Sequence, residues 1–113
     1  LAAEVTAPWP DKHGPLLGVP MLTGWVPIDV TMTGRWPLML YTDGLIEGFH
    51  QGERLGEDGL RAFVGAEISI DPELATLPDR LIARVEEANG GALSDDIALV
   101  VIDVADASTA DRA

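Results

Sequence analysis

The sequence contains no cysteine, no long hydrophobic run and few basic residues, and each absence narrows what the chain can be. Without cysteine, disulfide bonds and thiolate metal sites are excluded, which favours a cytoplasmic protein. No run of about 18 apolar residues occurs, so we expect no membrane-spanning helix. The opening LAAEVTAPWP lacks a basic stretch followed by an apolar core and does not predict a signal peptide. It also lacks an initiator methionine, which suggests a piece of a longer protein.

Basic residues are scarce relative to acidic ones. Seven lysines and arginines stand against 19 aspartates and glutamates, so the net charge is −12. Nucleic acid is not an expected partner, because phosphate backbones are held by clusters of lysine and arginine. Two interpretations of the acidic excess remain open. The carboxylates either keep the chain soluble or converge in part on a hard cation, which prefers oxygen ligands.

The apolar pattern predicts one domain, residues 1–113, with strands at both ends of its ordered part. The chain has 113 residues, of which 47% are hydrophobic, enough for a modest core. Residues 1–24 are rich in proline and glycine and predict a loop-rich leading segment, whereas 105–113 predict a frayed tail. Residues 25–32 alternate as an edge strand does. The apolar runs at 37–42 and 97–102 predict strands buried on both faces.

Two segments between these apolar runs have helical spacing. Residues 59–65 predict a short helix flanked by glycines. Residues 76–89 predict a second helix, in which Thr76 and Asp79 have the spacing of a capping box and Gly90 supplies the stop. Strands, then helices, then a closing strand predict an α+β fold with mostly antiparallel sheet strands and two helices.

Two acidic positions lie at the ends of the predicted buried strands. In LMLYTDGLIEG, residues 38–48, Asp43-Gly44 stands between apolar runs and predicts a tight hairpin with LIEGF as the returning strand. Asp95 and Asp96 precede the last apolar run, so their carboxylates would meet that of Asp43 if the strands are neighbours. A divalent cation would neutralise such a cluster, and oxygen ligands favour Mg²⁺ or Mn²⁺ over Zn²⁺ or Cu²⁺. From spacing alone, turn residues and metal ligands remain alternative interpretations.

Other residues are weaker candidates for a functional site. His13 and His50 have no serine or cysteine partner pattern, and the three tryptophans are expected to pack in or around the core. No glycine-rich phosphate loop, nucleophile elbow or metalloprotease helix is present.

Four segments occur in an order typical of a known family. They are GPLLGV (14–19), LMLYTDGLIEG (38–48), ERLGEDGLRAFV (53–64) and LSDDIALVVI (93–102). Over residues 14–104 the chain resembles the metal-dependent (PPM-type) protein serine/threonine phosphatases, in their bacterial SpoIIE-like branch. The resemblance implies part of an αββα sandwich with a binuclear Mn²⁺ or Mg²⁺ site. It implies Asp43 and Asp95 as metal ligands, with Asp96 and Gly44 as supporting positions.

The same resemblance implies a reaction and a partner. In the family a metal-activated water attacks phosphorus directly, without a phosphoenzyme. Typical substrates are phosphoserine or phosphothreonine on regulatory proteins of the anti-anti-sigma-factor type, within bacterial partner-switching control of transcription.

The match covers only the C-terminal half of the family domain, and nothing here corresponds to the Gly-Asp motif of its N-terminal half. Half a sandwich leaves an apolar sheet face and strand edges uncovered. We therefore expect the isolated chain to be inactive, to bind metal weakly, and to associate with itself or with the missing half. Two alternatives are a truncated or degenerate, non-catalytic module that binds a regulatory protein, and an unrelated acidic α+β domain.

Overall fold

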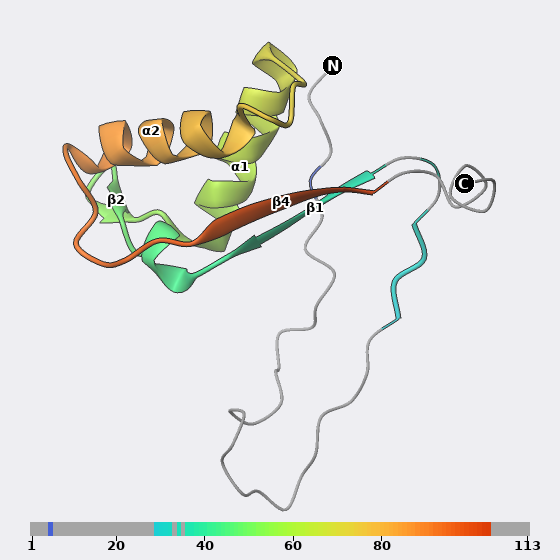
Figure 1. The fold of residues 1–113 in the computed structure, drawn as a ribbon. Coiled ribbons are helices and arrows are strands. Elements are labelled where there is room, and N and C mark those ends of the chain that lie inside the picture. The colour runs from blue at the N-terminus through green and yellow to red at the C-terminus, as the bar shows by residue number, and fades with distance from the viewer. Residues whose placement is uncertain (1–4, 6–28, 33, 35, 105–113) are drawn as a thin grey trace, which may run out of the picture.

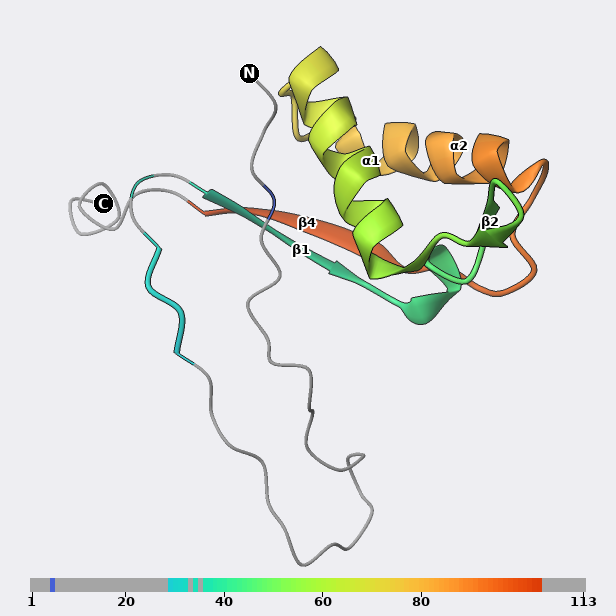
Figure 2. The same ribbon diagram turned by 180° about the vertical axis from the view of Figure 1, so that it is seen from behind.

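The computed structural model describes Val5, residues 29–32, Gly34 and residues 36–104. Within them the chain forms an α+β arrangement of two helices and two antiparallel two-stranded sheets, which confirms the predicted fold class (Figures 1 and 2). In chain order the elements are β1 (Trp36–Tyr41), the 3-10 helix η1 (Asp43–Leu45), β2 (Phe49–His50), β3 (Glu53–Arg54), α1 (Gly56–Ile70), α2 (Leu77–Asn89) and β4 (Leu99–Val104).

Several expectations fall on other parts of the chain. The leading segment 1–24 with its GPLLGV motif, His13 and the tail 105–113 lie outside the described residues. Of the strand predicted at 25–32, only residues 29–32 are described, and they are not in a strand. The prediction is wrong for these four residues. An alternating pattern becomes a strand only beside a partner, and the described partner of β1 is β4.

The first and last strands of the described chain pair with each other. β1 and β4 run antiparallel, with register from Trp36 opposite Val104 to Tyr41 opposite Leu99. This ribbon is the long two-stranded feature in Figure 1, with both helices on one side of it. The end at Tyr41 and Leu99 carries the segments that hold Asp43 and Asp95, so the pairing brings two distant parts of the sequence together.

The ribbon is buried on one face only. Met39, Tyr41 and Leu99 pack against the hydrophobic core. On the opposite face Leu40, Val100 and Ile102 keep 49%, 52% and 42% of their surface exposed. The prediction of strands buried on both faces is therefore wrong, because the helices cover a single face of the ribbon.

The core lies between the ribbon and the helices. Leu45 and Leu81 are fully buried at its centre, and its remaining buried members are Leu55, Leu60, Val64 and Val85. Burial, followed by the negative charge of Glu57, raises the pKa of Tyr41, so its phenol is neutral where it meets this core. Because Leu45 belongs to η1, the core also anchors the turn that follows β1.

The Asp43-Gly44 pair does not form the predicted hairpin turn. β1 runs instead into η1, and the hairpin comes later, where Gln51 and Gly52 join β2 to β3 with φ of 54° and 83°. Two consecutive positive φ values are typical of a tight type I′ turn. The prediction failed because the burial of Leu45 and the pairing of β1 with β4 outweigh the local turn preference.

Both helices exist, with one correction to each. α1 continues through Gly59 and Gly65 to Ile70, well beyond the predicted short helix. Gly59 lies where a Cβ would come within 2.6 Å of a Leu55 methyl group, so it serves close packing within the helix. α2 ends as predicted, with Gly90 at φ 82°. The capping box is wrong, because the Thr76 hydroxyl makes no cap bond and instead accepts a hydrogen bond from Arg80 Nε at 3.1 Å.

A buried carboxylate joins the two helices. Glu67 of α1 accepts a hydrogen bond from Arg84 Nε at 2.6 Å and one from Arg80 Nη1 at 3.1 Å, both donors lying on α2. The hydrogen bond from Arg84 is the largest effect that lowers the pKa of Glu67, and burial opposes it. Glu67 is therefore ionised and fixes the crossing of the helices.

Candidate metal centre

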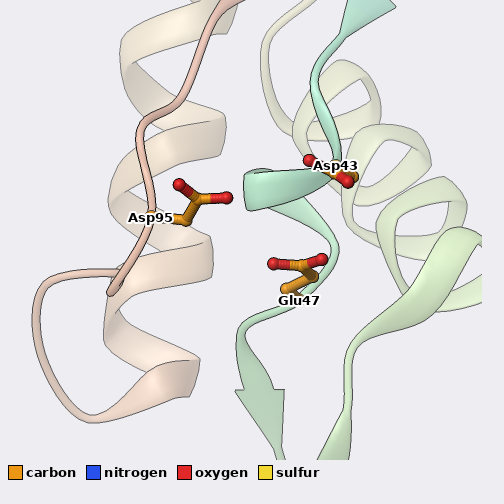
Figure 3. A group of neighbouring side chains, drawn as sticks. All are labelled: Asp43, Glu47 and Asp95. Carbon is orange, nitrogen blue, oxygen red and sulfur yellow. The ribbon is translucent and has the colours of Figure 1, made fainter.

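Three carboxylates gather at the end of the β1–β4 ribbon. One oxygen each of Asp43, Glu47 and Asp95 lies within 4.8 Å of the other two, and all three residues are exposed. Asp43 and Glu47 come from η1 and the turn after it, whereas Asp95 reaches across from the segment before β4 (Figure 3). The structure thus brings Asp43 and Asp95 together from positions far apart in the sequence.

The turn after β1 places Asp43 and Glu47 on the same side. The Asp43 carbonyl accepts hydrogen bonds from the N–H groups of Ile46, at 3.0 Å, and Glu47, at 3.1 Å. The bond from Glu47 spans four residues, as in a helix, and residues four apart are neighbours on a helical surface. Leu45 is fully buried in the core and holds this turn in place.

The turn lies against the segment that carries Asp95. A Cβ on Gly44 would lie 2.4 Å from the Asp96 carbonyl oxygen and 3.4 Å from the Asp95 Cβ. Only a residue without a side chain allows this approach. Gly44, predicted as a supporting position, is therefore where the two halves of the cluster meet.

Asp96 differs from Asp95 in its geometry. Its carboxylate is not part of the cluster, whereas its backbone N–H donates to Asp95 Oδ1 at 2.8 Å. This bond orients the Asp95 side chain. Asp96 contributes to the cluster through its backbone.

Glu47 was missed by the sequence reasoning. A tight hairpin at Asp43-Gly44 would have placed Glu47 along the returning strand, away from the turn that holds Asp43. The signal was its spacing of four residues from Asp43, which becomes informative only if the segment turns helically.

The donor set suits a hard divalent cation. It consists of three exposed carboxylates within reach of one another. Carboxylate oxygens are the ligands of Mg²⁺, Mn²⁺ and Ca²⁺, and the negative charges repel one another until a cation neutralises them. Asp43, Glu47 and Asp95 would hold such an ion.

Of the two candidate histidines, only His50 lies in the described part of the chain, and it packs against an aromatic ring. The His50 ring meets Phe63 edge-on, with centroids 5.2 Å apart. The open pocket between α1 and α2 that these two rings line also contains Glu67, whose carboxylate is paired with Arg80 and Arg84.

A comparison with protein families shows to which family the chain belongs. The family model described as Stage II sporulation protein E (SpoIIE) matches residues 2–105. The chain belongs to the SpoIIE family. No curated protein and no solved structure showed significant similarity to it.

Membership of the SpoIIE family identifies the chain as a PPM-type phosphatase-like domain. The interpretation as an unrelated acidic domain is therefore wrong. Within the part of the chain that the structure describes, no helix is both long and apolar enough to cross a membrane.

Proposed function

We propose that this chain is the C-terminal portion of a metal-dependent protein serine/threonine phosphatase domain. Asp43, Glu47 and Asp95 bind Mn²⁺ or Mg²⁺ in it. The observation that carries the proposal is the meeting of the three carboxylates at the end of the β1–β4 ribbon, in a chain of the SpoIIE family.

The chain's own residues hold and orient the ion. Asp43 and Glu47 come from one turn and Asp95 from the opposite segment. The spacing of the three carboxylates therefore depends on how firmly the turn and that segment are held against each other. All three carboxylates are exposed, which leaves the centre open to a phosphorylated side chain on another protein. When bound, the cation supplies positive charge for phosphate oxygens and activates water for attack on phosphorus.

The centre is completed by groups beyond these three carboxylates. Mg²⁺ and Mn²⁺ favour octahedral oxygen coordination, so a bound ion would need further oxygen ligands, which water, substrate phosphate and residues of the N-terminal half of the domain would supply. By itself the chain is inactive and binds metal weakly.

The exposed ribbon face supports association with that half or with a second copy. Leu40, Val100 and Ile102 form an apolar patch that the helices leave bare. Val100→Lys should abolish concentration-dependent association in sedimentation velocity. Ile70→Lys is the matched control, because Ile70 is 70% exposed on α1, away from the ribbon. Equal association of both variants and the wild type would contradict this part of the proposal.

The substrate proposed is phosphoserine or phosphothreonine on a cytoplasmic regulatory protein of the anti-anti-sigma type, in bacterial partner switching. Family membership alone supports this step. The second candidate is a non-catalytic module that binds such a protein. The exposed apolar face of the ribbon supports it, since such a face can bind a protein whether or not the metal centre is active.

Manganese titration tests the metal centre. Electron paramagnetic resonance of free Mn²⁺ measures weak affinities, and Asp43→Asn, Glu47→Gln and Asp95→Asn should each reduce binding. Glu53→Gln is the control, since Glu53 is an exposed acid on β3 outside the cluster. If all four variants bind Mn²⁺ as the wild type does, the proposed centre is refuted.

Reconstitution with the N-terminal half separates the two candidate functions. Hydrolysis of a phosphoserine peptide that is lost in Asp43→Asn identifies an enzyme. Binding of the regulatory protein without hydrolysis identifies the module.

A further inference from the structure

The β1–β4 ladder continues one residue past the strands, at Thr42 and Ala98. The Thr42 N–H donates to the Ala98 carbonyl at 3.0 Å, as the register of the ribbon requires. In a regular antiparallel pair the Thr42 carbonyl would accept the return bond from Ala98. It accepts instead from the Leu45 N–H at 3.2 Å, which opens η1.

The Thr42 hydroxyl takes the place of that carbonyl. The Ala98 N–H donates to Thr42 Oγ1 at 2.9 Å, and the hydroxyl lies 3.4 Å from the Ala98 carbonyl, to which it donates. The chain can therefore leave the ladder for η1 while Ala98 keeps its acceptor. A valine has the same shape and strand preference but offers no acceptor.

The hydroxyl is not an ordinary helix cap. Thr42 stands at the N-cap of η1, yet its side chain makes no bond to that helix. Its partner is 56 residues away in the sequence. The bond therefore joins the segment of Asp43 to that of Asp95.

We propose that Thr42 is a positioning residue of the metal centre, which sets the spacing between Asp43 and Asp95 through its hydroxyl bond to Ala98. The inference rests on the proposed function, because it assigns Thr42 a role in metal affinity. Thr42 precedes Asp43 directly, and Ala98 follows Asp95 by three residues. Losing the bond removes one of the contacts that hold the two sides of the cluster together.

The test compares Thr42→Val, Thr42→Ser and the wild type in two measurements. The first is Mn²⁺ affinity by electron paramagnetic resonance, at a temperature where circular dichroism shows each variant folded. The second is hydrogen exchange of the Ala98 amide by NMR, which needs no metal. Thr76→Val is the matched control, since the Thr76 hydroxyl bonds to Arg80 and Glu73, at the start of α2.

Thr42→Val should speed Ala98 exchange and weaken Mn²⁺ binding by about three- to tenfold each, the ratio that corresponds to one net hydrogen bond. Thr42→Ser should restore both, and Thr76→Val should change neither. Faster exchange with unchanged affinity would overturn the positioning role. Unchanged exchange would overturn the bond itself.

The two proposals fail in different ways. If wild-type Mn²⁺ binding does not depend on Asp43 and Asp95, the proposed function fails and the role of Thr42 fails with it. If binding depends on both aspartates but Thr42→Val binds as tightly as the wild type, only the role of Thr42 fails.

Discussion

Replacing Gly44 by alanine should pull the candidate metal centre apart. The new Cβ would lie 2.4 Å from the Asp96 carbonyl oxygen and 3.3 Å from its carbon. Even the closest favourable carbon–oxygen contacts in proteins are about 3.3 Å. The turn that carries Asp43 must therefore move away from the Asp95–Asp96 segment by about 1 Å.

Neither side can absorb this movement locally. The obstructing atoms are backbone, which cannot rotate away as a side chain can. On the other side, the buried Leu45 and the Thr42–Ala98 bonds hold the turn. Ligand distances in metal sites hold to about 0.2 Å, so a 1 Å separation removes at least one ligand from bonding distance. We expect Mn²⁺ affinity to fall by about tenfold or more, which is at least about 1.4 kcal/mol.

The control separates loss of geometry from loss of stability. Overpacking at Gly44 should cost about 1–3 kcal/mol of folding stability. Gly52→Ala in the β2–β3 turn should cost about 1–2 kcal/mol, because Gly52 has φ 83° and open space around it. Urea titration should show comparable losses, and Mn²⁺ resonance should show weaker binding only for Gly44→Ala. Wild-type affinity in a folded Gly44→Ala protein would refute the close-approach argument.

Two further predictions concern the helices. Leu81→Ala should lower the free energy of unfolding by about 2–5 kcal/mol in urea, since it empties a fully buried core position; a change below about 1 kcal/mol would mean that the core is assigned wrongly. Glu67→Gln should flatten the acid limb of a stability–pH curve. The pKa of Glu67 is held below its ordinary 4.5, chiefly by the Arg84 hydrogen bond, so its contribution is full above about pH 4.5 and is lost as pH falls through the lowered folded-state pKa. Parallel curves below pH 4.5 for wild type and variant would contradict this, with Glu87→Gln as the exposed control.

Local patterns predicted both helices and the two longer strands, but neither the full length of α1 nor the faces that the strands bury. The span of α2 follows from its apolar stripe and from Gly90, both of which are local features. Whether Leu40 and Val100 are buried depends on what covers the ribbon, and the helices cover only its other face. A continuous apolar run therefore predicts a strand better than it predicts burial on both faces.

The candidate site was also predictable only in part, because the sequence pattern identifies its residues but not which of them meet. Asp43 and Asp95 stand out as acids beside apolar runs, yet their meeting depends on the register of β1 with β4, which no local pattern contains. The family resemblance supplied that long-range information. Glu47 stayed hidden because Asp43-Gly44 favours a hairpin locally, and only the burial of Leu45 turns the chain into η1 instead.

The cluster is held together by groups that carry no charge. Three carboxylates within 4.8 Å of one another, in a chain of net charge −12, repel and would separate if the ribbon end were free. The Thr42–Ala98 bonds, the glycine contact at Gly44 and the buried Leu45 oppose that repulsion. A cation that bridges the two segments would turn this repulsion into a net attraction, and its binding would stabilise the folded chain by mass action. Metal affinity and the stability of the ribbon end should therefore change together, whichever of these contacts is altered.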